Sequence, residues 1–175
     1  ATDRSLRAAR VFRGCDGADR QGDTHQGAMS RHPLVLFDID RTLLRTGGAG
    51  TRAMARTARD LFGPARVDAP VRVAGRTDAW MVARIAAHHG VPYSADVLDR
   101  FERAYLLALA EEMQDATRSG AVCRGVPALL ECLVRREHVR VGVLTGNFRR
   151  AAELKLAQFG LLEYFDVGAF GEDAL

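Results

Sequence analysis

Residues 34–46 read LVLFDIDRTLLRT, and this stretch decides the expected fold class. The four apolar residues 34–37 run unbroken into Asp38, a pattern typical of a short strand buried on both faces of a parallel sheet. A second aspartate, Asp40, follows two residues later. A carboxylate near a core is costly unless a partner or a reaction uses it. The stretch therefore predicts a core strand with two acidic side chains at its carboxyl end.

The rest of the chain predicts helices and strands in an order typical of an α/β protein. Gly47 and Gly48 suit a hinge, and helical apolar patterns follow as far as residue 120. The Thr77–Asp78 pair and Ser94 are expected to cap two of these helices. Beyond residue 120 the expected elements alternate again: a helix at 127–134, a strand at 139–144, a helix at 151–159 and a third strand at 165–170.

Together these elements predict a Rossmann-like parallel α/β core, residues 31–46 and 121–175, with an α-helical cap, residues 47–120, inserted after the first strand. Residues 1–30 are rich in Arg, Gly, Asp and Gln and have little to bury. We expect them to form a disordered leader.

Composition excludes several classes of partner. The chain has 175 residues and a formal net charge of +3, and its arginines are scattered, so no nucleic-acid-binding stripe is expected. No segment approaches the roughly 20 apolar residues of a membrane span, so no membrane partner is expected. Cys15, Cys123 and Cys132 form no CxxC pair. This usage favours free thiols in a reducing compartment, and we expect a cytoplasmic protein.

The DxDxT pattern at residues 38–42 has residue types that suit phosphate or acyl chemistry. Ligands of open parallel α/β sheets bind beyond the carboxyl ends of the strands, where Asp38 is expected. An ionised Asp38 could act as a nucleophile, and a protonated Asp40 could donate to a leaving group. Two close carboxylates also suit Mg²⁺. The alternative is a loop with a helix cap at Asp40 or Thr42.

Two further places offer suitable chemistry. Thr145, Gly146 and Asn147 follow the predicted strand VRVGVL, where a hydroxyl and free backbone N–H groups can hold a phosphate or merely cap a helix. Lys155 is the only lysine among 25 lysines and arginines. A lone lysine in such a chain indicates a place that needs a compact ammonium beside a phosphate or carboxylate. The alternative is an ordinary surface lysine.

These residues together resemble the haloacid dehalogenase superfamily of hydrolases, over roughly residues 31–175. FDIDRTLL resembles the first motif of the family, VLTGN the second, and the lysine in AELKL the third. AGRTDAWMV resembles the start of the cap helix in the phosphoglycolate phosphatase-like branch, and FGLLEYFDVGAFGED resembles the segment after the third motif.

The resemblance implies the catalytic roles. Asp38 would be the nucleophile that forms an aspartyl-phosphate, and Asp40 the general acid and base. Thr145 would bind the phosphoryl group, and Lys155 would steady the nucleophile and the transferring group. Mg²⁺ would be held by the Asp38 carboxylate and the backbone carbonyl of Asp40. The presence of Asp40 favours a phosphatase over a dehalogenase, because breaking a carbon–halogen bond needs no protonated leaving group.

Four further residues are expected to contact the substrate. Thr42 completes the DxDxT pattern, and Gly146 and Asn147 form the turn beside Thr145. Arg76, at the start of the cap helix, would meet a substrate carboxylate; a surface salt bridge is the alternative. The expected substrate is a small phosphorylated metabolite.

The chain departs from the family pattern in two ways. Arg41 stands where the family usually has glycine, which permits backbone conformations that arginine resists. The fourth motif, an acidic pair on a further strand that supplies metal ligands, has no counterpart after Phe170. Glu172 and Asp173 are possible substitutes, although the family has a loop there. Without that strand, residues 34–37 would form a bare apolar edge, a template for association.

Two hypotheses follow from the sequence. The first is a Mg²⁺-dependent phosphatase, with activity possibly impaired by the missing motif. The second is a non-catalytic member of the fold that associates, with itself or a partner, through the exposed first strand.

Overall fold

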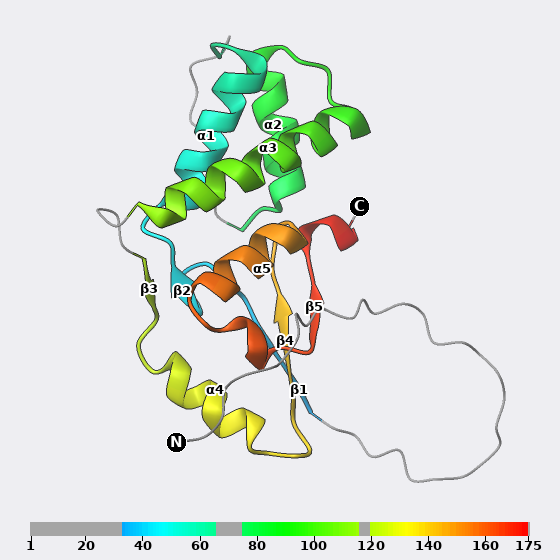
Figure 1. The fold of residues 1–175 in the computed structure, drawn as a ribbon. Coiled ribbons are helices and arrows are strands. Elements are labelled where there is room, and N and C mark those ends of the chain that lie inside the picture. Colours follow the sequence, from blue (N-terminus) through cyan, green and yellow to red (C-terminus); the bar gives the residue numbers. More distant parts are fainter. Residues whose placement is uncertain (1–32, 66–74, 116–119, 175) are drawn as a thin grey trace, which may run out of the picture.

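A computed structural model describes residues 33–65, 75–115 and 120–174 (Figure 1). Its main sheet has three parallel strands in the order β1-β4-β5, namely β1 (Leu34–Phe37), β4 (Arg140–Leu144) and β5 (Val167–Ala169). The predicted α/β fold with a helical insertion after the first strand is confirmed. The predicted leader, residues 1–30 with Cys15, lies outside the described residues.

Two helices pack on one face of this sheet. They are α4 (Val126–Val134), with a proline in its first turn, and α5 (Arg149–Gln158). Val141 and Val143 of β4 form a buried cluster with Leu130 of α4 and Leu156 of α5. This cluster fixes the position of α5 beneath the carboxyl ends of the strands, where the third predicted motif lies.

The prediction that the first strand is buried on both faces is wrong. Val35 and Phe37 are half-buried, whereas Leu34 and Leu36 are 51% and 46% exposed. The reason is that β1 is an edge strand, and among the described residues no helix covers the face that carries Leu34 and Leu36. An unbroken apolar run cannot distinguish a strand covered on both sides from one covered on a single side.

A second, two-stranded sheet joins the core to the helical insertion. It pairs β2 (Leu44–Arg45) with β3 (Ala121–Val122) in antiparallel fashion. The pairing brings the start and the end of the insertion side by side (Figure 1).

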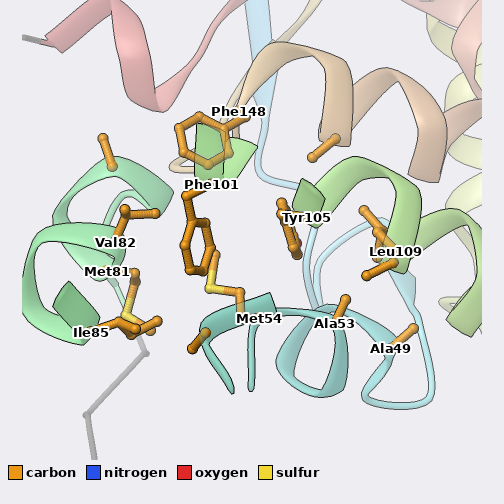
Figure 2. Packing of buried hydrophobic residues seen from close by; sticks show 14 residues of the cluster. Ala49, Ala53, Met54, Met81, Val82, Ile85, Phe101, Tyr105, Leu109 and Phe148 are labelled. Atoms are coloured by element: carbon orange, nitrogen blue, oxygen red, sulfur yellow. The ribbon is translucent and has the colours of Figure 1, made fainter. Parts of the chain in front are cut away.

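The insertion contains α1 (Ala49–Phe62), α2 (Asp78–His89) and α3 (Ala95–Gln114), which pack together around a buried cluster (Figure 2). The two predicted caps are confirmed: Thr77 accepts a hydrogen bond from the Trp80 N–H, and Ser94 accepts one from the Val97 N–H, both at 3.2 Å. Phe148, from the core, reaches into this cluster beside Tyr105, with ring centroids 6.3 Å apart. The cap and the core therefore share a packed interface.

Candidate active site

The first carboxylates of the site follow β1. Ile39 is fully buried and anchors the turn, while Asp38 and Asp40 on either side of it are both exposed at the sheet edge. The Asp38 carboxylate lies 3.5 Å from the Thr42 hydroxyl, a weak contact that leaves its oxygens accessible. Asp38 is therefore placed as a free carboxylate facing the cavity described below.

The loop after β4 brings three more predicted residues to the same edge, because β1 and β4 are parallel neighbours. The Asn147 side chain donates hydrogen bonds to Asp40 Oδ2 at 2.9 Å and to the Thr145 hydroxyl at 2.7 Å. The Asn147 N–H also donates to the Thr145 hydroxyl, at 3.3 Å. Thr145 and Asn147 are both buried, so the loop is held firmly around Gly146.

Lys155 completes this network from α5. Its side chain is almost fully buried, with the residue 3% exposed, and its ammonium donates to both Asp40 oxygens at 3.0 and 2.8 Å and to Asn147 Oδ1 at 2.5 Å. An ammonium has three donors, and here each has an acceptor. The surface alternative for this lysine is wrong. The resemblance implied that Lys155 steadies the nucleophile Asp38 and the transferring group, whereas in the structure its ammonium contacts Asp40 and Asn147.

Arg76 lies apart from this network. It lines the same cavity, and its guanidinium stacks over the Trp80 ring at 4.9 Å from the centroid. The structure thus brings together Asp40, Thr145, Asn147 and Lys155, places Asp38 and Thr42 beside them, and leaves Arg76 on the cap side.

The cavity between the cap and the core has a volume of about 1470 Å³. Its floor is formed by the two aspartates, the loop after β4 and Lys155, and its walls include Met54, Met81 and Ile85 of the cap. A cavity with a polar floor and apolar walls is typical of a small-molecule site.

Two cap residues face this site without having been predicted. Asp78 Oδ2 accepts a hydrogen bond from the Phe148 N–H at 2.9 Å. Burial raises the pKa of Asp78 to about 6, with smaller upward effects of Asp40 and Glu172 and with Lys155 and the Phe148 N–H opposing. Burial also raises the pKa of Tyr105 well above its ordinary value, so this hydroxyl stays neutral. The sequence signals were an aspartate beside a helix cap and a tyrosine in an apolar stripe, both typical of ordinary helices.

The raised pKa of Asp78 predicts a pH-dependent effect on stability. The folded chain binds this proton more tightly than the unfolded chain does, so the ionised carboxylate lowers stability increasingly as pH rises from 4 through 6. Asp78→Asn removes the charge and keeps an oxygen acceptor for the Phe148 N–H. We expect urea unfolding to show the variant about 1–3 kcal/mol more stable than the wild type at pH 8. This difference in the free energy of unfolding should shrink towards pH 4. Equal stability of the variant and the wild type at pH 8 would contradict the prediction.

Metal ligands in the described ranges are few. No group of three or more histidine, cysteine, aspartate or glutamate side chains is placed to hold a metal ion there. The predicted ligands, the Asp38 carboxylate and the Asp40 main-chain carbonyl, are oxygen donors of the kind that suits Mg²⁺, which proteins commonly hold through one or two carboxylates together with water and substrate phosphate. The Asp38 oxygens are accessible for this role.

Glu172 and Asp173 are engaged elsewhere. Glu172 accepts a hydrogen bond from the Arg149 N–H at 2.9 Å at the start of α5, and Asp173 accepts one from the Phe170 N–H at 2.8 Å. The Arg149 guanidinium also lies 3.3 Å from Asp173. These contacts favour structural roles over roles as substitute metal ligands: Glu172 caps the start of α5, and Asp173 stabilises the turn after β5.

Arg41 adopts a left-handed backbone conformation, with φ at +66°. Its N–H donates to the Leu44 carbonyl at 2.8 Å, which closes the turn after Asp40. The left-handed region costs an L-residue roughly 1–2 kcal/mol, and glycine avoids this cost at the expense of a more flexible unfolded chain.

Arg41→Gly is therefore expected to raise the free energy of unfolding by about 0.5–1 kcal/mol, as measured by urea denaturation. Arg103→Gly, within α3, is the matched control and should lower it by about the same amount, because glycine is unfavourable inside a helix. A loss of stability in Arg41→Gly would show that the side chain compensates for the strained backbone.

An α/β sheet with a helical insertion after its first strand, and with a carboxylate, hydroxyl and ammonium network at the carboxyl ends of its strands, is the arrangement of a cap-bearing hydrolase. The chain belongs to the haloacid dehalogenase-like hydrolase family, whose model matches residues 35–174. The resemblance inferred from FDIDRTLL, VLTGN and AELKL is thus confirmed. No curated protein matches the sequence.

Several solved structures share this fold. A predicted phosphoglycolate phosphatase from Haemophilus somnus has a TM-score of 0.54 and 16% identity, covering 84% of this chain and 65% of that one. CbbY from Rhodobacter sphaeroides, in complex with phosphate, has a TM-score of 0.59 and 22% identity, covering 81% and 64%. A hydrolase from Pseudomonas syringae has a TM-score of 0.57 and 19% identity, covering 82% and 63%. The chain spans slightly less than two thirds of the length of these proteins.

None of the helices in the described ranges has the length and apolar character needed to cross a bilayer.

Proposed function

We propose that this chain carries the cap and the catalytic edge of a Mg²⁺-dependent phosphatase that hydrolyses a small phosphorylated metabolite. The observation that supports it most is the contrast between the two aspartates. Asp40 is held by Lys155 and Asn147, whereas Asp38, two residues earlier at the end of β1, faces the cavity with its carboxylate accessible. CbbY, which shares the fold, binds phosphate in its crystals, and this supports a phosphate ester as the substrate class.

The proposed reaction has two steps. A carboxylate oxygen of Asp38 attacks phosphorus, the bond from phosphorus to the ester oxygen breaks, and Asp40, which enters this step protonated, gives its proton to the leaving oxygen. Water then attacks phosphorus and gives a proton to Asp40, the bond from phosphorus to the Asp38 oxygen breaks, and phosphate leaves with both aspartates restored. The Asp38 carboxylate and the Asp40 main-chain carbonyl would hold Mg²⁺, which supplies charge neutralisation for the phosphoryl group when bound.

The remaining polar residues bind and orient the phosphoryl group. The Thr145 hydroxyl and the Gly146 N–H would donate to its oxygens, while Asn147 orients the Thr145 hydroxyl and Thr42 lies beside Asp38. The Lys155 ammonium adds positive charge beneath this cradle. The cap, residues 47–120, would cover the substrate. Arg76, on the cap side of the cavity, would contact the part of the substrate away from the phosphoryl group. A cytoplasmic location is part of the proposal, supported by the free thiols of Cys123 and Cys132.

The direct test is hydrolysis of p-nitrophenyl phosphate by the purified 175-residue chain, with Mg²⁺ and with EDTA. Turnover that requires Mg²⁺ would support the proposal. A folded chain without turnover, or turnover unaffected by EDTA, would overturn it.

A second candidate function, association through β1, is favoured by one observation. Within the described residues the outer edge of β1 has no strand partner, and its Leu34 and Leu36 (51% and 46% exposed) are apolar side chains open to solvent. Such an edge is a template for a second chain.

Light scattering would test this association. A self-associating chain would have a mass above 19.1 kDa, and Leu36→Lys should return it to the monomer. The control is Leu107→Lys on the distant helix α3, which should leave the mass unchanged. A monomeric wild type would rule out self-association.

A further inference from the structure

The first residue of cap helix α2, Asp78, is bonded to the loop that carries the phosphate-binding candidates. The Asp78 N–H donates to the Gly146 carbonyl at 2.7 Å, and the Phe148 N–H donates to Asp78 Oδ2 at 2.9 Å. Asp78 donates one of these bonds and accepts the other. The two bonds reach the loop at Gly146 and Phe148, on either side of Asn147. One cap residue therefore holds both sides of the loop after β4.

The backbones of the cap and the loop touch at this point. A Cβ atom on Gly146 would lie 2.6 Å from the Arg76 carbonyl oxygen and 3.1 Å from Thr77 Cα. A Cβ atom on Gly171 would lie 2.3 Å from the Gly146 carbonyl oxygen, and the Gly171 N–H donates to the Asn147 carbonyl at 2.9 Å. No side chain can fit between these segments, so a shift of the start of α2 is transmitted to the loop directly.

Phe148 strengthens this connection, because it contacts the cap in two ways. Its N–H is bound by Asp78, and its ring lies in the cap cluster beside Tyr105 (Figure 2). On the other side of the loop, Asn147 bonds Asp40, Thr145 and Lys155. The position of the loop thus determines whether Asn147 reaches its three partners.

The charges around Asp78 come from several elements. Lys155 of α5 is its cationic neighbour, and Asp40, Glu172 and the phenol of Tyr105 face it from the turn after β1, the segment after β5 and α3. Burial disfavours the ionised carboxylate here, so the hold on the Phe148 N–H is expected to depend on the acceptor oxygen of Asp78 and not on its charge.

We propose that Asp78 is a positioning residue, which holds the loop 145–148 in the conformation that joins Asn147 to Asp40 and Lys155 and so couples docking of the cap to the geometry of the phosphate site. The coupling to catalysis rests on the function proposed above. The contact by which Asp78 holds the loop does not depend on that function, and amide hydrogen exchange measures it separately.

The hold is tested by amide hydrogen exchange, followed by NMR, in Asp78→Ala, Asp78→Asn and Thr77→Ala. In Asp78→Ala the Phe148 and Gly171 amides should exchange at least tenfold faster than in the wild type. Asp78→Asn keeps an acceptor oxygen and should stay within threefold. Thr77→Ala removes the cap on the Trp80 N–H and should affect Trp80 while leaving Phe148 unchanged.

Unchanged exchange at Phe148 in Asp78→Ala would overturn the proposal. Equal acceleration in Thr77→Ala would also overturn it, because fraying of α2 would then explain the effect. If Asp78→Ala does not fold, Asp78→Ser, whose side chain is too short to reach the Phe148 N–H, takes its place.

The coupling is tested by the kinetics of p-nitrophenyl phosphate hydrolysis. Asp78→Ala should lower kcat/KM at least tenfold, mainly through KM, because the loop binds the phosphoryl group, and Asp78→Asn should restore it to within threefold. Faster exchange without a change in kcat/KM would overturn the coupling. A wild type without turnover would overturn the proposed function, while the exchange rates would still decide whether Asp78 holds the loop.

Discussion

Asp38→Asn is expected to lower kcat for p-nitrophenyl phosphate roughly a thousandfold or more, with a free energy of unfolding within about 0.5 kcal/mol of the wild type. An amide oxygen is a poor nucleophile towards phosphorus, so no aspartyl-phosphate can form at this position. Stability should be preserved because Asp38 is exposed and makes only the 3.5 Å contact with Thr42 among its described neighbours. Steady-state kinetics with Mg²⁺ and urea unfolding measure the two quantities.

Asp60→Asn provides the matched control for this substitution. Asp60 is an exposed aspartate near the end of α1, outside the cavity, and its loss should leave kcat unchanged. Wild-type turnover in Asp38→Asn would show that another group attacks the phosphate. A large loss of stability would show that the Asp38 carboxylate has a structural role.

The second large effect concerns stability: removing Asp40 and removing Lys155, the two members of one ion pair, should change the free energy of unfolding by different amounts. Asp40→Ala would leave a buried ammonium with Asn147 Oδ1 as its remaining acceptor in the network. Removing one partner of a fully buried pair costs about 3–5 kcal/mol. Because the Asp40 side chain is 44% exposed, we expect a smaller loss, about 2–3 kcal/mol.

Lys155→Met should behave differently. The methionine side chain fills the space of the lysine stem, and the Asp40 carboxylate that remains can be hydrated, so stability should stay within about 1 kcal/mol of the wild type. Its kcat/KM should nevertheless fall roughly a hundredfold or more, because the positive charge under the phosphate cradle is lost. Urea unfolding compares the two variants, and equal destabilisation would contradict the asymmetry. Asp40→Asn, which keeps an acceptor oxygen, should lie between them.

The sequence predicted the parts of the site that depend on local pattern. The apolar runs before Asp38 and Thr145 identified two strands, and parallel pairing of neighbouring strands then places their ends together. The scarcity of lysine correctly indicated that Lys155 occupies a special place. These inferences succeed because strand ends and buried charges leave a signal within a few residues.

Other features have no local signal. Whether Lys155 meets Asp38 or Asp40 depends on side-chain geometry between residues 115 positions apart. The strands β2 and β3 have two residues each, too few to show any alternation. Asp78 follows a helix cap, and nothing in its neighbourhood predicts that its carboxylate bonds a loop 70 residues further along the chain.

The small ladder between β2 and β3 has a consequence for how this architecture can vary. Leu44 pairs with Val122 and Arg45 with Ala121, so the inserted segment leaves and returns at one place. An insertion with adjacent ends does not alter the path of its host, and lengthening it adds little to the entropy of closing the loop. A helical insertion of another size could therefore be joined at these two residue pairs without disturbing the register of β1 on β4, provided that it supplies an acceptor for the Phe148 N–H in place of Asp78. A chimaera joined at Arg45 and Ala121 that keeps this contact is expected to retain the network of Asp40, Asn147 and Lys155 while the cap side of the cavity changes.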